Sequence, residues 1–373
     1  METLEKLKIL SADSQYDLAC ACGTTPEEHR RKGEDGRWLY PVTMPGGGRS
    51  ILLKTLLSNT CANDCKYCPL RCDTNIRRCT LSPDETARAF MDYLVRRNIF
   101  GLFLSSGVIG TPDRTMERLN AVASILRRVH RFRGYIHLKI IPGASDAAIR
   151  EAISLASAVS LNIETPGEKY FQKLSVRKHF MQDIIRPLKL MAQLTGRGEP
   201  YARVKTTTQF VVGAADETDA EIVRYMFGLY GRLHMRRIYF SAYQAGLGAP
   251  GIPGETAGAP APAERCLREH RLYQADFLVR KYGFKAEDFT FDARNNLSLE
   301  KDPKKLWTEN HPGFYPVNVN RADRETLLRV PGFGPITVAQ ILNRRRERRV
   351  TTLQELNLGK KRLEQACAYV RFD

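Results

Sequence analysis

The sequence lacks any apolar run long enough to cross a membrane. The apolar stretch 99–104 has the length of a strand, far short of the ~18–20 residues that a membrane-spanning helix needs. The segment Met1–Lys6 also lacks a basic region that leads into an apolar one, so we expect no export signal. These two absences argue against a membrane protein and predict a cytoplasmic one.

Acidic residues are few relative to basic ones. The 373 residues include 41 Asp and Glu against 58 Lys and Arg, which gives a net charge of +17. Such an excess favours polyanionic partners, nucleic acid above all, although anionic membranes, acidic substrates or an ordinary basic enzyme would also fit. The length and the apolar fraction of 43% suit one large domain with a smaller one, or two medium domains.

Three of the nine cysteines stand unusually close together. Cys61, Cys65 and Cys68 form a C-x3-C-x2-C run directly after the apolar stretch 51–57. In a reducing compartment, such spacing indicates metal ligands before disulfides. Three thiolates on one loop can bind three irons of a [4Fe–4S] cluster and leave the fourth iron open to a small molecule. On spacing alone, the set Cys65, Cys68 and Cys72 is an alternative, and so is a zinc knuckle with Cys72 as the fourth ligand.

The other cysteines form no compact pattern. Cys20, Cys22, Cys72 and Cys79 have poor spacings for a second metal site, which the sequence leaves open. Cys266 and Cys367 fall within helical patterns and are expected to be buried as small apolar side chains.

From residue 51 onward, strand and helix patterns alternate. Strands are predicted at Ile51–Leu57, Ile99–Ser105, Tyr135–Ile141, Val159–Glu164, Val204–Val212 and Arg237–Ala242. Helices are predicted at Pro83–Arg97, Asp113–Arg131, Ser145–Leu155, Lys178–Leu194 and Thr218–Arg232. Six such units predict an α/β fold for 51–243, either an open (βα)6 partial barrel or a doubly wound sheet. Loops after the strands should carry the chemistry, and the cysteine run lies on the first of them.

The composition of the segments before and after 51–243 predicts their organisation. Residues 1–50 are expected to form an irregular N-terminal cap. In 244–263, 15 of 20 residues are Gly, Pro or Ala, which indicates a linker or a long surface loop. A charged helix at 263–282 and an irregular strap at 289–314 follow, so 244–315 should connect two domains.

Residues 316–373 are predicted to form a small all-α domain. The pattern at 327–342 is a helix, a Gly-Phe-Gly hairpin and a second helix, whose N-terminal N–H groups form an anion site suited to a phosphodiester. A weaker copy follows at 353–367, and the 12 Lys and Arg against 6 Asp and Glu contribute +6. The expected nucleic-acid-binding residues are Gly332, Phe333, Gly334, Thr337, Arg344, Arg345, Arg346 and Arg349.

The three-cysteine loop and the array of strands around it resemble the radical S-adenosylmethionine (SAM) superfamily, whose fold is a partial (βα)6 TIM-like barrel. The resemblance implies a [4Fe–4S] cluster on Cys61, Cys65 and Cys68, with SAM as the second cofactor. Reductive cleavage of SAM would yield a 5′-deoxyadenosyl radical, and the electron would come from a donor such as ferredoxin or flavodoxin.

The same resemblance implies positions for SAM on the loops after the strands. Ser105, Ser106 and Gly107 stand where the family binds the methionine amine, although the two serines replace its usual residues. The other implied positions are Asn162 and Glu164 for the ribose, Val212 and Gly213 for the adenine, together with Tyr67, Ser241 and Tyr243. Lys173, Arg177 and Lys178 follow the fourth strand and could line a path for a polyanion, but a solvated surface is the commoner meaning of such a group.

Four stretches resemble one subgroup of the superfamily more specifically: Phe103–Val108, Ser160–Glu164, Thr208–Ala214 and Arg268–Asp276. This subgroup is assigned to DNA modification or repair and is linked to a uracil-DNA-glycosylase-like partner. The segment 316–373 resembles the helix-hairpin-helix domain of competence-type DNA receptors. Together they imply a radical SAM enzyme that modifies or repairs nucleic acid, DNA in preference to RNA. The alternatives are a radical SAM enzyme that modifies RNA or tRNA, and a redox-sensing iron–sulfur DNA-binding protein without turnover.

Overall fold

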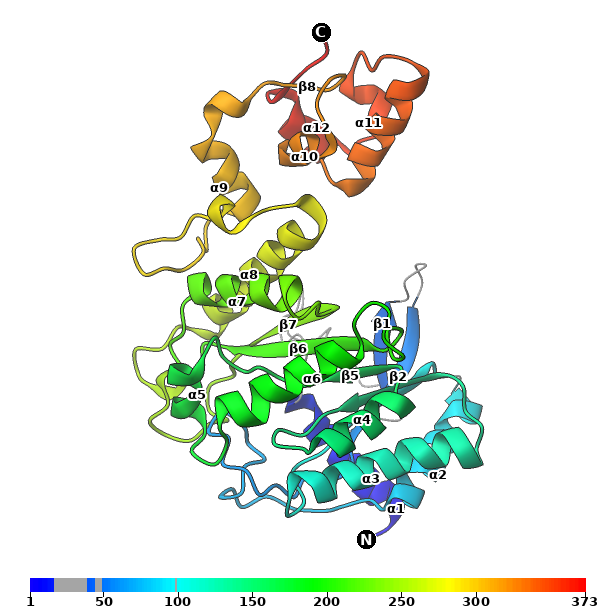
Figure 1. Ribbon diagram of the computed structural model, residues 1–373. Helices are drawn as coiled ribbons and strands as arrows, with labels where there is room; N and C mark the ends of the chain where they lie inside the picture. The colour runs from blue at the N-terminus through cyan, green and yellow to red at the C-terminus, as the bar shows by residue number, and fades with distance from the viewer. Residues whose placement is uncertain (17–38, 44–48, 98) are drawn as a thin grey trace. The chain divides into compact units, whose positions relative to one another are not determined.

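A computed structural model describes residues 1–16, 39–43, 49–97 and 99–373 (Figure 1). The predictions for Cys20 and Cys22, and most of the predicted N-terminal cap, lie outside the described residues. The chain divides into two compact units, Met1–Glu217 with Tyr225–Glu269, and Thr218–Arg224 with His270–Asp373. The two units are described separately.

The first unit is built on a seven-stranded sheet in the order β1 to β7 (Figure 1). Strand β1 (Leu39–Thr43) pairs antiparallel with β2 (Arg49–Leu56). Parallel strands follow: β3 (Gly101–Ser105), β4 (Tyr135–Lys139), β5 (Ala158–Ser160), β6 (Lys205–Val212) and β7 (Arg237–Ala242). A doubly wound sheet reverses its strand order at a switch point, and this sheet does not. The sheet curls into a half-barrel, which confirms the predicted (βα)6 partial barrel.

The helices between the strands agree with the predictions in number more than in length. They are α2 (Pro83–Arg97), α3 (Pro112–Ser124), α4 (Asp146–Leu155), α6 (Arg186–Leu194) and α7 (Asp219–Gly231). The end of the second predicted helix, at Ile125–Val129, and the start of the fourth, at Phe180–Ile185, are π-helical. A further helix, α5 (Glu168–Leu174), was not predicted.

Local chemistry explains why α2 begins where it was predicted to begin. The Ser82 Oγ accepts from the Glu85 N–H at 3.1 Å, and the Glu85 carboxylate accepts from the Ser82 N–H at 2.7 Å. This capping box satisfies two N–H groups that have no partner within the helix. Glu85 also binds the Lys6 ammonium at 2.9 Å, which attaches the N-terminal helix α1 (Thr3–Asp13). The prediction of an irregular cap is therefore wrong for α1, whose Leu7 and Leu10 are buried.

The sheet has one fully covered face. Side chains of alternate strand residues on this face are at most 1% exposed: Leu53, Leu102, Leu104, Ile136, Leu138, Val159, Phe210, Ile238 and Phe240. Helices α2, α3, α4 and α6 run along one side of the sheet (Figure 1). Since successive side chains of a strand point to opposite faces, the opposite face carries the residues between these apolar ones.

The second unit contains the C-terminal helices. It includes the end of α8 (Pro262–Tyr282), then η6 (Ala286–Asp288), α9 (Pro303–Asn310), η7 (Pro312–Phe314), α10 (Arg324–Arg329), α11 (Pro335–Glu347), η8 (Leu353–Leu356) and α12 (Lys360–Cys367). Leu327, Leu328, Phe333, Val338 and Ile341 form the centre of its apolar core. The predicted strap is thus partly helical, and a two-residue parallel pair, β8 (Val317–Asn318) with β9 (Val370–Arg371), departs from the predicted all-α fold. Among the described residues, no helix is long and apolar enough to cross a membrane.

Candidate active site

The loop that carries Cys61, Cys65 and Cys68 leaves the carboxyl end of β2. Its backbone is held by segments from elsewhere in the first unit. The Ala62 N–H donates to the Val108 carbonyl at 2.9 Å, and the Lys66 N–H donates to the Leu174 carbonyl at 2.8 Å. Segments that follow β3 and β5 therefore help to fix the path of the cysteine run.

Asp64, within the run, organises the chain after α5. Its carboxylate accepts from the Ser175 hydroxyl at 2.5 Å, from the Val176 N–H at 2.9 Å and from the Arg177 N–H at 3.4 Å. Burial alone would raise the pKa of Asp64, but these hydrogen bonds outweigh it and lower the pKa below the ordinary value. Asp64 thus joins the cysteine loop to the turn that precedes Lys178.

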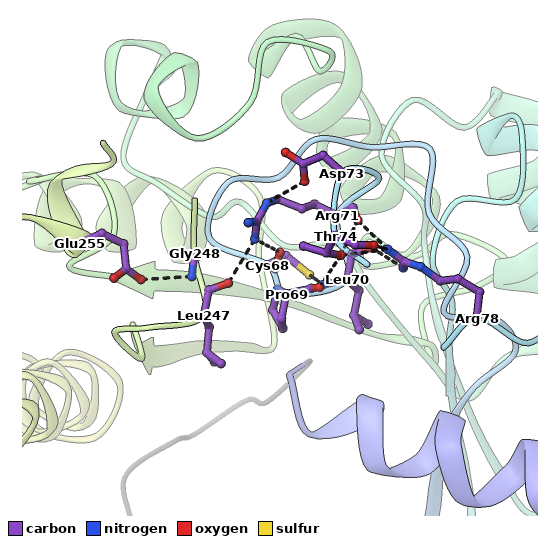
Figure 2. A network of polar contacts seen from close by, with 10 residues as sticks. All are labelled: Cys68, Pro69, Leu70, Arg71, Asp73, Thr74, Arg78, Leu247, Gly248 and Glu255. Atoms are coloured by element: carbon purple, nitrogen blue, oxygen red, sulfur yellow. Dashed lines mark hydrogen bonds and ion pairs between the residues drawn. The ribbon is translucent and has the colours of Figure 1, made fainter. Parts of the chain in front are cut away.

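Two arginines enclose the carboxyl-terminal half of the loop (Figure 2). The Arg78 guanidinium donates to the Leu70 carbonyl at 2.8 Å and to the Arg71 carbonyl at 2.7 Å. Arg71 in turn donates to the carbonyls of Cys68 and Leu247, each at 3.1 Å. These bonds hold the backbone beside Cys68 without using its sulfur, which remains available to a metal.

The thiols of Cys61, Cys65 and Cys68 are free and close enough to affect one another. Burial is the main cause that raises the pKa of Cys65 and Cys68, and the charges of the neighbouring cysteines raise it further. Thiolates at Cys65 and Cys68 are therefore unfavourable here unless a cation compensates them, as iron does. The thiol of Cys72 is exposed, and that of Cys79 is buried 3.9 Å from the Lys6 carbonyl. Neither supports the overlapping cysteine set.

The donor set fits a cluster better than a single ion. Within the described part of the chain, no group of three or more His, Cys, Asp or Glu side chains stands close enough to hold one metal ion. Each thiolate of a [4Fe–4S] cluster binds a different iron, so its ligands can stand farther apart. Cys61, Cys65 and Cys68 are the residues that would hold the cluster.

Gly107, after β3, packs directly on the cysteine loop. A Cβ atom at this position would lie 2.4 Å from the Thr60 carbonyl oxygen and 3.2 Å from the Cys61 Cβ. The Gly107 N–H donates to the Ser58 carbonyl at 2.7 Å. Ser105 is buried, and the Ser106 hydroxyl donates to the Gly107 carbonyl at 2.6 Å. The structure thus places Gly107, one of the three residues predicted for the methionine amine, against Cys61.

Tyr67, on the cysteine loop, contacts Glu164, which is far from it in sequence. The Tyr67 hydroxyl donates to the Glu164 carboxylate at 2.5 Å, and the Asn162 amide donates to its other oxygen at 3.4 Å. Glu164 is 4% exposed and has a φ of 64°. Burial and the negative charge of Glu164 raise the pKa of Tyr67 well above its ordinary value, so the tyrosine stays a hydrogen-bond donor.

The predicted positions after β6 and β7 also lie together. The Gly213 N–H donates to the buried Glu217 carboxylate at 2.6 Å, and the Tyr243 N–H donates to the Val212 carbonyl at 2.8 Å. Ser241 pairs with Val211 in the strand register and is partly exposed.

Residues 244–261 form a loop that contacts the cysteine loop, which is the second of the two predicted alternatives, a linker or a long surface loop. Glu255 accepts from the Tyr243 hydroxyl and from the Gly246 N–H at 2.9 Å. It also accepts from the Gly248 N–H at 3.1 Å (Figure 2). The Ala249 N–H donates to the Lys66 carbonyl at 2.7 Å. This glycine-rich loop is held in one conformation because the Glu255 carboxylate accepts hydrogen bonds from its backbone N–H groups.

Lys178 is a residue of the site that sequence reasoning did not find. Its side chain is 7% exposed, hydrogen-bonds to the Cys65 thiol and lies 5.1 Å from the centre of the Phe171 ring. The negative charges of Cys65 and Glu164 outweigh its burial and raise its pKa. The solvated surface that was expected describes Lys173, which binds Asp216 at 2.7 Å in the open. Only the position of Lys178 after the fourth strand hinted at its role.

The predicted nucleic-acid-binding residues of the second unit fall into two groups, one at the hairpin 332–334 and one at the far end of α11. Gly332 has a φ of +76°, and a Cβ there would lie 2.4 Å from the Arg362 carbonyl oxygen. Gly334 caps α11 in extended conformation, so the N–H groups at the start of α11 remain near the hairpin. The side chains of Phe333 and Thr337 are 1% and 3% exposed, so they cannot contact a phosphate as predicted.

The basic run lies at the other end of α11. Arg344 begins ten residues after Gly334, about 15 Å along the helix. Arg345 donates to the carbonyls of Val319, at 3.1 Å, and Ala322, at 2.6 Å. Arg344 binds Glu355, and Arg349 donates to the Phe372 carbonyl at 2.9 Å, whereas Arg346 is exposed. The cations beside the hairpin are instead Lys360, Lys361 and Arg362, all exposed in the first turn of α12.

Residues 55–227 match the family model of the Radical SAM superfamily. This segment is a radical SAM domain. Its cofactors are a [4Fe–4S] cluster and SAM, and the three free thiols on the loop after β2 fit the first of them. When bound, these cofactors supply a carbon-centred radical that can abstract hydrogen from a substrate. The residues around the loop fix the cysteines and keep Tyr67 protonated.

The domain also has structural relatives at low identity. Methylornithine synthase (PylB) is 15% identical with a TM-score of 0.47, over 60% of this chain and 62% of that one. HydG from Carboxydothermus hydrogenoformans is 13% identical with a TM-score of 0.46, over 61% and 51%. Native anSMEcpe with bound AdoMet is 16% identical with a TM-score of 0.41, over 61% of each chain. The chain thus spans about three fifths or less of these structures, and no curated protein matches it.

Proposed function

We propose that this chain is a radical SAM enzyme that modifies or repairs nucleic acid, DNA in preference to RNA, and holds it through residues 316–373. The observation that carries the proposal is the hairpin at Gly332–Gly334 beside three exposed cations. The hairpin precedes the N-terminus of α11, and the Arg362 carbonyl of α12 packs against Gly332. The exposed cations Lys360, Lys361 and Arg362 in the first turn of α12, together with the start of α11, suit a phosphodiester backbone.

Binding of this kind depends on the charge and shape of the nucleic acid backbone. Contacts from backbone N–H groups and lysines to phosphates carry no sequence information, so we propose low sequence specificity and a strong dependence on salt. A target atom on a base of duplex DNA would have to be flipped out or locally single-stranded to reach the radical. The family resemblance of Phe103–Val108 and Arg268–Asp276 supports DNA over RNA and a uracil-DNA-glycosylase-like partner.

For the radical step, we propose that SAM binds across the loops that follow the parallel strands. Gly107 with Ser105 and Ser106 holds the methionine end beside Cys61, and Asn162 with Glu164 holds the ribose. The remaining residues of the proposed SAM site are Tyr67, Val212, Gly213, Ser241 and Tyr243. As radical SAM enzymes generally need an electron donor, a ferredoxin or flavodoxin would supply the electron.

We call the hairpin 332–334 with Lys360, Lys361 and Arg362 the anchor. Measurement of DNA binding tests its proposed role. The double variant Lys360→Gln/Lys361→Gln of the reconstituted holoenzyme should bind a fluorescent DNA duplex more weakly, and the slope of log K against log salt should fall by about 0.9 for each lost phosphate contact. Arg346→Gln, at the far end of α11, is the matched control and should change the slope less. A matched RNA duplex should bind more weakly than DNA. Unchanged DNA binding in the double variant would reject this surface as the anchor.

Assays of SAM cleavage and of DNA modification test the proposed reaction. The reduced holoenzyme with SAM should release 5′-deoxyadenosine, and Lys360→Gln/Lys361→Gln should retain this activity because it changes only the second unit. Incubation with DNA, followed by mass spectrometry of its nucleosides, should reveal a new nucleoside mass. If no 5′-deoxyadenosine forms under any reducing condition, the redox-sensing alternative replaces the enzyme.

A further inference from the structure

Three segments that lead into the parallel strands of the half-barrel are rich in exposed cations. They are 128–134 before β4, 195–205 at the start of β6 and 232–236 before β7. Because β4 to β7 are parallel, the three segments share the amino edge of the sheet, at the opposite ends of the strands from the edge where β2 leads into the cysteine loop. We call their exposed cations the basic edge: Arg128, Arg131, Arg133, Arg197, Arg203, Lys205, Arg232 and Arg236.

Hydrogen bonds connect the three segments across the sheet. Before β5, the Ser157 hydroxyl accepts from the Arg127 guanidinium at 3.3 Å, and the Ser157 carbonyl accepts from the Lys205 N–H at 3.1 Å. The Arg236 N–H donates to the Thr206 carbonyl at 2.8 Å. The segments therefore lie side by side over three strand spacings, a width of about 15 Å.

Arg127 fixes the turn that carries the first three cations of the basic edge. Its guanidinium donates to three backbone carbonyls, those of Phe132 at 2.7 Å, Gly134 at 2.8 Å and Leu155 at 2.9 Å. Arg131 has a φ of 53°, a left-handed conformation that ends the helical segment. The exposed arginines thus extend from a turn that is already held in place, so binding there does not have to order the backbone.

The basic edge contains most of the positive charge that the chain carries before its C-terminal segment. Residues 1–315 contain 46 Lys and Arg against 35 Asp and Glu, which gives +11. The 23 residues of the three segments contribute eight of these cations and one carboxylate, Glu199, which gives +7. None of the eight forms an ion pair with a residue that the structure describes, whereas the exposed Lys173 binds Asp216. A surface with charge of one sign attracts polyanions.

We propose that the basic edge binds the phosphate backbone of the nucleic acid substrate, a second contact that rests on the proposed function. Seven of its eight cations are arginines, whose planar guanidinium binds phosphate through two parallel hydrogen bonds and stays charged. Strand β6 has eight residues, so its two ends lie about 25 Å apart. Backbone at the amino edge therefore belongs to a part of the nucleic acid that flanks the reacting nucleotide. Its contacts add affinity and salt dependence to those of the anchor.

The test measures how tightly the reconstituted holoenzyme binds a fluorescent DNA duplex over a range of salt concentrations. Arg128→Gln/Arg131→Gln should bind more weakly, and the slope of log K against log salt should fall by about 0.9 for each phosphate contact that is lost. Arg127 stays intact because it holds the turn. Arg150→Gln/Lys189→Gln removes the same charge from exposed positions on α4 and α6, and this matched control should leave the slope unchanged.

Two results would overturn the proposal: an unchanged slope in Arg128→Gln/Arg131→Gln, or an equal fall in the control. Thermal unfolding and iron content show whether each variant folds, and Arg203→Gln/Arg236→Gln repeats the test in the other two segments. Vesicles that contain phosphatidylserine test another polyanionic surface. Binding to vesicles that depends on these arginines, with DNA binding unchanged, would assign the basic edge to a membrane and reject the proposal.

Failure of the basic edge is distinguishable from failure of the proposed function. A slope that falls only in Lys360→Gln/Lys361→Gln rejects the basic edge and keeps the anchor. A slope that falls in Arg128→Gln/Arg131→Gln, without a new nucleoside mass after turnover, supports the basic edge and rejects the proposed modification. A wild-type holoenzyme that binds neither DNA nor RNA rejects both.

Discussion

The side chain of Lys178 hydrogen-bonds to the thiol of Cys65, 113 residues away along the sequence. The contact exists because Asp64, next to Cys65, binds Ser175, Val176 and Arg177 and so brings the chain before Lys178 to the cysteine loop. The ammonium is buried and adjacent to Glu164 as well as to Cys65. It is therefore a fixed positive charge beside a ligand of the cluster.

We predict that Lys178→Met lowers the reduction potential of the cluster. Reduction adds negative charge, which a nearby ammonium stabilises, and hydrogen bonds to cluster sulfurs also raise the potential. A unit charge ~6 Å away at an effective dielectric constant of ~20 is worth about 3 kcal/mol, on the order of 100 mV for one electron. A redox titration followed by electron paramagnetic resonance measures the shift.

Two variants serve as controls for this prediction. Lys178→Arg keeps the charge and should shift the potential less than Lys178→Met. Lys173→Met removes an exposed lysine paired with Asp216 and should leave the potential unchanged. A potential that stays the same in Lys178→Met would show that the ammonium does not act on the cluster.

Gly107→Ala should reduce the iron and sulfide content of the reconstituted protein. The new methyl group would meet the Thr60 carbonyl oxygen at 2.4 Å, and neither backbone can yield without displacing Cys61. Ser106→Ala changes the neighbouring residue without adding an atom and should bind a full cluster. Chemical analysis of iron and sulfide in the two variants decides the matter, and equal content in both would refute the contact.

The two glycines of the hairpin should respond differently to substitution. Gly332→Ala is strained at a φ of +76° and collides with the Arg362 backbone, so we expect it to destabilise the second unit by about 2 kcal/mol or more. Gly334→Ala has extended backbone and meets only the Tyr282 hydroxyl at 3.3 Å, so it should cost well under that. Urea unfolding followed by Trp307 fluorescence compares them. Equal losses would contradict the structure, and a test of DNA binding should avoid Gly332.

The regular elements of the half-barrel were predictable because their causes are local. The bounds of α2 and β7 coincide with the predicted ones, since a capping box begins α2 and a clear alternation marks β7. The fourth predicted strand, Val159–Glu164, failed at its end: β5 stops at Ser160, and Glu164 turns back with a φ of 64° to meet Tyr67. That turn depends on a partner 97 residues away, which no local pattern contains.

The same reason explains what was missed in the site. Residue types identified the cysteines and the loops after the strands, because the order of parallel strands brings those loops to one edge. Nothing in the sequence around Lys178 distinguishes it from Lys173, since only the fold buries one of them. Likewise, the basic run 344–349 attracts attention by composition, but the helix rise places it far from the hairpin that Lys360 and Lys361 adjoin.

Lys304 provides a prediction about pH. In the second unit, its ammonium donates to the Phe333 carbonyl at 2.7 Å and lies 4.8 Å from the centre of the Tyr282 ring. Burial is the main cause that lowers its pKa from 10.5 to about 7, which Asp302 opposes and Arg329 reinforces. Between about pH 7 and 10.5 the unfolded chain therefore binds more protons at this lysine than the folded chain does. Stability contributed by this position must rise with pH across that window and stay constant below it.

Lys304→Met keeps the apolar stem and removes the proton. Relative to this variant, the wild-type protein should gain stability from pH 7 to pH 10, by about 1–2 kcal/mol after allowance for partial exposure to solvent. Urea unfolding of the holoenzyme, followed by Trp307 fluorescence in a Trp38→Phe background, reports on the second unit alone. Lys305→Met changes the exposed neighbouring lysine and should show the same pH dependence as the wild-type protein. If the curves for wild type and Lys304→Met run parallel from pH 7 to pH 10, Lys304 is not buried as a charge beside the hairpin.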